Sequence, residues 1–145
     1  MIRKGIIIGT ISGLLLGFFL KGIEYLTGVK VYTLLLNVDF IPIIGDIQWP
    51  EFIEFFFHCI ISFLIGILYL YIIEKSSNKW FGEHPLFTSF LITLPTIPLY
   101  FPLVLLAEKT VPPLWDIVAF TYWGLGHIVY FFSLYVSYKW LYKKG

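Results

Sequence analysis

The sequence predicts an all-α membrane protein folded as a bundle of four transmembrane helices. Four apolar stretches, near residues 5–26, 52–73, 86–107 and 117–138, fill most of the 145 residues. Each is about 22 residues long, and a bilayer core about 30 Å thick needs about 20 apolar residues of helix. Hydrophobic residues make up 59% of the chain and charged residues 13%, whereas a soluble domain carries about 25% charged residues.

These four stretches leave only short loops, so the chain is expected to form a single integral membrane domain spanning residues 1–145. Cys59 is the only cysteine and lies inside the second stretch, which excludes a disulfide within one chain. The net charge of +1 gives no reason to expect a nucleic-acid partner. Membrane lipids are the expected surroundings, and no cofactor is expected.

The charges are distributed unevenly between the two ends of the predicted bundle. Seven of the 10 Lys and Arg residues fall at one end: Arg3, Lys4, Lys75, Lys79, Lys139, Lys143 and Lys144. Seven of the 9 acidic residues fall at the other: Glu24, Asp39, Asp46, Glu51, Glu54, Glu108 and Asp116. Because cytoplasmic loops carry the excess of Lys and Arg, both termini are predicted to be cytoplasmic, with an acidic vestibule outside.

The first span carries glycines at every fourth position: Gly5, Gly9, Gly13 and Gly17. Such a face of bare backbone lets another helix approach closely in lipid, and the partner is either another span or a second copy of the chain. The spacing therefore makes a homo-oligomer an expected state. Lys21 and Glu24 follow on one helix face and are predicted to pair as rim charges.

Residues 27–50 are too polar and interrupted for a span, so they are expected to form an outer amphipathic or re-entrant segment. The second span begins at Pro50-Glu51, a favourable helix start. A polar stripe then runs along it at intervals of three and four residues: Glu51, Glu54, His58 and Ser62.

The third span contains Pro95, Pro98 and Pro102, so it is predicted to be kinked or partly unwound. The fourth span follows Pro112-Pro113 and places Asp116 at the rim and His127 deeper on approximately the same face. His127 and His58 are expected at comparable depths below the outer surface, where they could meet inside the bundle.

Ionisable side chains inside a membrane suggest a functional site, because they are costly in lipid. The candidate proton or ligand site comprises Glu54, His58, Ser62 and His127, with Lys21, Glu24, Glu51 and Asp116 as rim charges. Glu54 is one turn from His58 and is expected to orient its imidazole. Three interpretations remain open: a proton-linked or pH-sensing site, a metal site, and structural hydrogen bonding between helices. No specific metal motif is present, so no metal is expected.

The pattern resembles the YagU-like family of small bacterial inner-membrane proteins. The matching motifs keep their order along most of the chain: Lys21-Gly22-x-Glu24, His58 with Ser62 and Glu74, Phe101-Pro102-Leu103, Pro112-Pro113, and Gly126-His127-x-Val129 with Ser133. Trp123 stands where the family pattern has an acidic residue. The resemblance implies a bacterial cytoplasmic-membrane location and a connection with acid tolerance.

The leading expectation is a small proton-linked or pH-responsive transport or channel-like protein that moves a proton or small ion. The alternative is a structural or partner-binding membrane subunit that oligomerises through the glycine face and transports nothing. A third interpretation is a lipid-binding or lipid-modifying protein. No nucleotide-binding loop, nucleophile elbow or metalloprotease motif is present, so the chain is not expected to be an enzyme.

Overall fold

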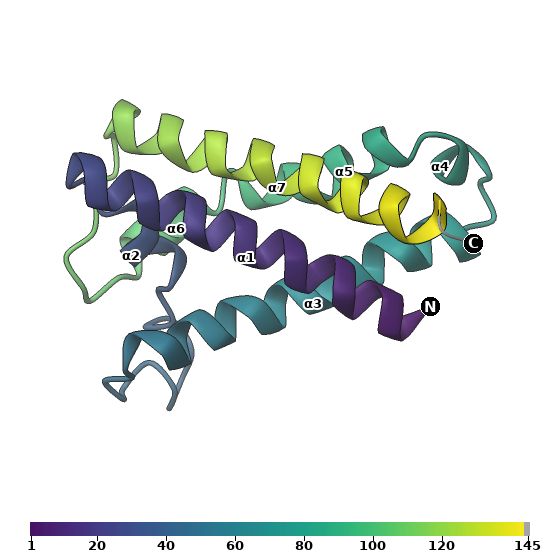
Figure 1. Ribbon diagram of the computed structural model, residues 1–145. Helices are drawn as coiled ribbons and strands as arrows, with labels where there is room; N and C mark the ends of the chain where they lie inside the picture. Colours follow the sequence, from purple (N-terminus) through teal and green to yellow (C-terminus); the bar gives the residue numbers. More distant parts are fainter. Residues whose placement is uncertain (144–145) are drawn as a thin grey trace.

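The computed structural model describes residues 1–143, which contain helices and no strand (Figure 1). The elements in chain order are α1 (Ile2–Thr27), α2 (Val31–Leu35), α3 (Glu51–Lys75), α4 (Trp80–Glu83), α5 (Pro85–Thr93), the 3₁₀ turn η1 (Leu94–Thr96), α6 (Tyr100–Leu105) and α7 (Ile117–Lys143). Lys144, one of the cations counted at the predicted cytoplasmic end, lies outside the described residues.

Four helical stretches are long and apolar enough to cross a membrane: Ile2–Thr27, Glu51–Lys75, Pro85–Leu105 and Ile117–Tyr142. The predicted multi-pass helical bundle is therefore confirmed, with each span within a few residues of its expected limits. The first span ends at Gly28, whose φ of 75° is the left-handed conformation that glycine adopts most easily at a helix end.

Helix α1 lies between α3 and α7 and makes its most extensive contacts with these two helices. Its glycine face packs against α3: a Cβ on Gly5 would lie 2.7 Å from the Ile67 Cα, and one on Gly13 would lie 2.8 Å from the Ser62 Cβ. A Cβ on Gly9 would overlap the Ser62 backbone oxygen. The glycine face therefore packs on another span of the same chain, which is one of the two partners that the sequence allowed.

This packing buries the surface that suggested self-association, because Gly5, Gly9, Gly13 and Gly17 are all inaccessible in one chain. A homo-oligomer stays a prediction, but it cannot use this face without separating α1 from α3. On its other side α1 contacts α7, where Leu16 and Leu20 cover Gly126.

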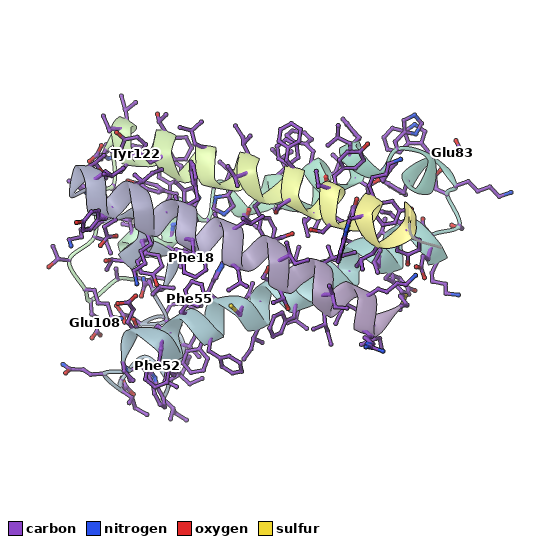
Figure 2. All side chains as sticks on the ribbon, viewed as in Figure 1. Phe18, Phe52, Phe55, Glu83, Glu108 and Tyr122 are labelled. Atoms are coloured by element: carbon purple, nitrogen blue, oxygen red, sulfur yellow. The ribbon has the colours of Figure 1, made fainter. Side chains whose placement is uncertain are left out.

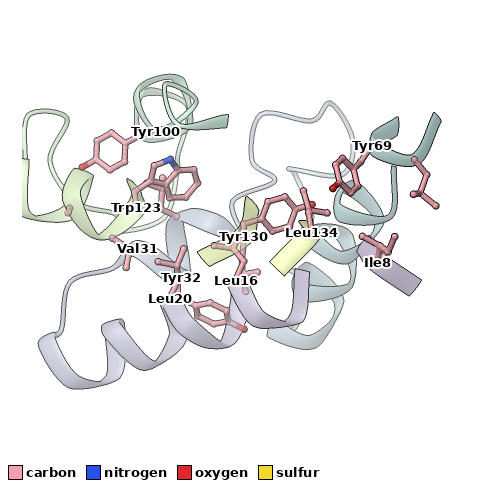
Figure 3. Close-up of a cluster of buried hydrophobic side chains, with 14 residues drawn as sticks. Ile8, Leu16, Leu20, Val31, Tyr32, Tyr69, Tyr100, Trp123, Tyr130 and Leu134 are labelled. Carbon is pink, nitrogen blue, oxygen red and sulfur yellow. The ribbon is translucent and has the colours of Figure 1, made fainter. Parts of the chain in front are cut away.

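The core contains several large aromatic side chains along the bundle (Figure 3). Tyr100 and Trp123 lie near one end, Tyr130 lies centrally, and Tyr69 lies near the other end beside Ile8 (Figure 3). Because water exclusion does not drive helix association inside lipid, close packing and hydrogen bonds hold such a core together.

The third span is broken, as its three prolines predict. Helix α5 ends at Thr93, η1 follows, and α6 begins only at Tyr100. The indole of Trp123 on α7 donates to the backbone oxygens of Thr96 and Ile97, at 3.3 and 3.1 Å. A neighbouring helix therefore satisfies carbonyls that the break releases, which is the condition for irregular backbone at membrane depth.

The segment between α1 and α3 covers one end of the bundle, as expected for an amphipathic or re-entrant element. Val31 and Leu34 of α2 are fully buried. The Asn37 amide donates to the Leu103 backbone oxygen at 2.9 Å, which fixes the segment to α6.

Both chain termini lie at the opposite end of the bundle (Figure 1). Glu83 lies at the same end as the termini, and Glu108 lies at the far end with Phe52 (Figure 2). The common end of the termini agrees with four membrane crossings. Which end faces the cytoplasm stays a prediction from the positive charges.

Candidate functional site

A cavity of about 140 Å³ lies within the bundle, between α3, α7 and the broken third span. Its apolar walls are formed by Leu16, Leu35, Phe40, Ile61, Ile65, Leu99 and Leu103. Its polar or hydrogen-bonding side chains are Asn37, His58, Ser62, Thr96, Trp123, His127 and Tyr130. A concave, mostly apolar space with a few convergent polar groups is the usual form of a ligand site.

The structure brings His58 from α3 and His127 from α7 to this one cavity. Both side chains are nearly inaccessible, with exposed fractions of 9% for His58 and 4% for His127. The His127 ring also packs on Trp123, with 4.5 Å between the ring centroids. The two histidines that the sequence placed at similar depth therefore do share one site.

Each histidine uses one ring nitrogen to bind a backbone oxygen. His58 Nε2 lies 3.1 Å from the Gly13 oxygen, and His127 Nδ1 lies 2.8 Å from the Trp123 oxygen. A carbonyl only accepts, so these nitrogens carry the hydrogen in the neutral rings. Among the described residues, His58 Nδ1 and His127 Nε2 have no hydrogen-bond partner. Each neutral imidazole thus keeps one basic nitrogen free.

Ser62 links three helices through its hydroxyl group. Its Oγ donates to the Gly9 oxygen on α1 at 2.7 Å and lies 2.9 Å from the Tyr130 hydroxyl on α7. Because Ser62 has a single hydrogen, Tyr130 is the donor in the second bond. Ser62 thus lines the predicted site, and its own hydrogen is used in holding α1, α3 and α7 together.

Glu54 does not orient His58, which corrects the sequence-based expectation. Its side chain is buried and forms an ion pair with Lys109, in the loop after α6. A buried carboxylate is costly unless it is paired, and an ammonium group compensates its charge better than a neutral imidazole does. Glu54 is absent from the described residues that line the cavity.

The rim charges also pair differently from the prediction. Lys21 binds Glu51 on α3, with 2.5 Å between Nζ and Oε1, and does not pair with Glu24. Glu24 instead lies 3.3 Å from Lys30 and accepts bonds from the backbone N–H and hydroxyl of Thr33, both at 2.8 Å. These contacts tie α3 and α2 to the end of α1, so the rim charges join elements rather than stabilise one helix.

Tyr32 on α2 adds a third group to the pair of Lys21 and Glu51. Its hydroxyl donates to Glu51 Oε1 at 3.0 Å. Partial burial, and then this hydrogen bond to a carboxylate, raise the pKa of Tyr32 well above its usual value. The phenol therefore stays protonated and keeps the donor role that the contact needs.

Asp116 acts as a helix cap. Its Oδ1 accepts a bond of 3.0 Å from the Ala119 backbone N–H in the first turn of α7. An acidic residue just before a helix, soon after Pro112-Pro113, is a recognisable helix-start signal, although only a rim charge was predicted at this position.

Sequence reasoning missed three residues: two at this end of the molecule and one in the cavity. Lys109 compensates Glu54, and Asp39 accepts bonds from the backbone N–H groups of Glu108 and Lys109, at 2.7 and 3.3 Å. Tyr130 reaches the cavity from α7. Tyr130 lies three residues after His127, so the helical spacing was a usable signal, whereas nothing in the sequence pairs residue 39 with residue 109.

No cluster of three or more His, Cys, Asp or Glu side chains suited to a metal occurs among the described residues. No family model, curated protein or solved structure matches the chain. The resemblance to the YagU-like family therefore stays a prediction. The fold itself identifies a multi-pass α-helical membrane protein. Two histidines, His58 and His127, line a cavity in its bundle.

Proposed function

We propose that this protein is a small proton-linked or pH-responsive transport or channel-like protein whose working site is the cavity between His58 and His127. One observation carries the proposal. Two buried imidazoles from different helices line the same cavity, and each retains a nitrogen without a partner among the described residues. A pair of ionisable side chains inside a membrane suggests a functional site, because such groups are costly to keep in lipid.

Histidine suits this role because its charge normally changes between about pH 5 and 8. A proton on either free nitrogen places a positive charge in the cavity. No carboxylate or ammonium group lines the cavity among the described residues, and Glu54 is already paired with Lys109. The charge must therefore be met by entering water, an anion or a movement of the walls. Protonation would in this way be coupled to cavity opening.

The broken third span provides a wall that could move. Thr96, Leu99 and Leu103 from this span line the cavity, and hydrogen bonds from Trp123 hold the break. Trp123 and His127 are joined by the bond from His127 Nδ1 to the Trp123 oxygen. A movement of the His127 ring can thus displace Trp123 and, through its hydrogen bonds, the backbone at the break. Discontinuous helices form substrate sites in several transporters.

The bacterial inner membrane, cytoplasmic termini and a role in acid tolerance belong to the same proposal. The first and third of these rest on the resemblance to the YagU-like family. The orientation rests on Lys75 at the end of α3 and Lys79 in the loop that follows, together with the basic residues near both termini.

The decisive experiment is a flux assay with the purified full-length protein in liposomes across external pH 4–8. The double variant His58→Gln/His127→Gln should lose pH-dependent proton or ion flux. His84→Gln is the matched control, because the third histidine is exposed and stacks on Trp80 with 4.5 Å between ring centroids. Unchanged pH dependence in a well-folded double variant would contradict the proposal.

A further inference from the structure

The cavity opens sideways toward the surface that faces lipid. Three of its lining residues are substantially exposed: Ile61 on α3 at 52%, Leu99 before α6 at 47%, and Phe40 after α2 at 43%. Ile61 and Leu99 belong to membrane-spanning segments, so their exposed surfaces meet acyl chains. We call these three residues the mouth of the cavity. A ligand dissolved in the membrane could enter there without crossing water.

The volume indicates what the interior can hold. At about 140 Å³, it is close to an engineered apolar cavity of about 150 Å³ that binds benzene. A single six-membered ring fits such a space, whereas a whole lipid does not. Any longer apolar tail must therefore pass through the mouth and remain among the acyl chains.

The polar side chains of the wall donate hydrogen bonds inside the protein, and only the Asn37 amide, which has two N–H groups and uses one, keeps a donor without a partner among the described residues. Asn37 donates to Leu103, Ser62 to Gly9, Thr96 to Thr93, and Tyr130 to Ser62. Trp123 donates to Thr96 and Ile97, and each histidine donates to a backbone oxygen.

The wall therefore offers mainly acceptors: the second nitrogens of His58 and His127, and the lone pairs of the Tyr130 oxygen. Acceptors that line an apolar cavity have few groups to bond with, so a ligand that supplies a donor gains a hydrogen bond there. A ligand that carries only acceptors would find one remaining donor, the second N–H of Asn37, and would otherwise meet lone pairs, so it would bind less tightly. The cavity thus selects for an O–H or N–H group on an apolar body.

We propose that the cavity binds a membrane-dissolved amphiphile whose ring-sized head carries a hydroxyl donor, the class represented by alkylphenols. The hydroxyl hydrogen bonds to the free nitrogen of His58 or His127, the ring fills the cavity, and the alkyl tail leaves through the mouth. The inference rests on the proposed function in treating this cavity as the working site, and it adds the class of ligand.

The test uses the full-length protein in phosphatidylcholine nanodiscs at one fixed pH with no gradient. The probe is para-hexylphenol with a photoreactive diazirine in its tail, compared with the methyl ether of the same molecule, which cannot donate. Crosslinked residues are mapped by mass spectrometry. Labelling by the phenol should concentrate at Ile61 and Leu99, should be displaced by excess unlabelled hexylphenol, and should exceed labelling by the ether about tenfold.

Two neighbouring positions on α3 provide a matched pair of variants. Ile65 lines the cavity, whereas Leu64 is 62% exposed and is not among the lining residues. Ile65→Trp should abolish displaceable labelling, and Leu64→Trp should preserve it. If Ile65→Trp fails to fold, the double variant His58→Phe/His127→Phe keeps both aromatic rings and removes both acceptors, so labelling by the phenol should fall toward that by the ether.

Equal, non-displaceable labelling by phenol and ether would overturn the inference, as would a folded Ile65→Trp variant that labels like Leu64→Trp. The binding test needs no flux, so the two proposals fail separately. Selective binding without pH-dependent flux would support the ligand class and contradict proton linkage. Flux lost in the double histidine variant, with no preference for the phenol, would overturn the ligand class alone.

Discussion

Replacing Gly9 by alanine is expected to destabilise the bundle by forcing α1 away from α3. The added Cβ would lie 2.8 Å from the Phe63 Cα and would overlap the Ser62 backbone oxygen. These neighbours are backbone atoms, so no side-chain rotation relieves the overlap. Reaching even the 3.4 Å limit of ordinary contact requires a movement of at least 0.6 Å from Phe63, the difference between 3.4 and 2.8 Å.

Such a movement weakens the packing between α1 and α3. A gap of about 0.5–1 Å loses a quarter to a half of each dispersion contact along the interface. Overpacking of this kind typically costs about 1–3 kcal/mol. The bond of 2.7 Å from Ser62 to the Gly9 oxygen would also lengthen. We therefore expect a loss of about 1–3 kcal/mol in the free energy of unfolding.

Gly22 provides the control on the same helix, because a Cβ there meets nothing within 4 Å. Gly22→Ala should be neutral or stabilising by up to about 1 kcal/mol, since alanine has the higher helix propensity. Both variants are compared with the wild type by denaturant-induced unfolding in detergent micelles. The reasoning fails if Gly9→Ala is as stable as the wild type, or if Gly22→Ala is destabilised equally.

Three further predictions concern the end of the bundle where α3 and α7 begin. Lys109→Met leaves the Glu54 carboxylate buried without its cation, so it should cost about 1–3 kcal/mol of unfolding free energy. Adding Glu54→Gln should recover most of the loss. Wild-type stability of the single variant Lys109→Met would contradict this. Asp116→Ala should cost about 1 kcal/mol by removing the α7 cap, and Asp116→Asn should cost much less; equal losses on thermal unfolding would argue against capping. Because the folded state raises the pKa of Tyr32, it binds the phenolic proton more tightly than the unfolded chain does. Its contribution is complete below the usual pKa of 10.0 and declines as the pH rises further. Tyr32→Phe should therefore reduce the loss of stability on raising the pH above this value, and an unaltered alkaline profile would refute the assignment.

The candidate site was predicted only in part from the sequence. Helical spacing and depth placed His58 and His127 at one level, because rise per residue and span limits follow from the chain itself. The same reasoning paired Glu54 with His58 and Lys21 with Glu24, and both pairings were wrong. The closest partner along a helix is not the best partner when a charge from another segment can reach the group.

The four spans, the close-packing face of α1 and the break at Pro95, Pro98 and Pro102 were determined by the sequence alone. Each depends on a local property: hydropathy over about 20 residues, a glycine at every fourth position, or the backbone N–H that proline lacks. The tertiary structure decided which helix covers the glycine face, which cation reaches Glu54, and that a cavity remains between α3, α7 and the broken span. These features depend on distances between segments far apart in the chain, and residue spacing carries no information about such distances.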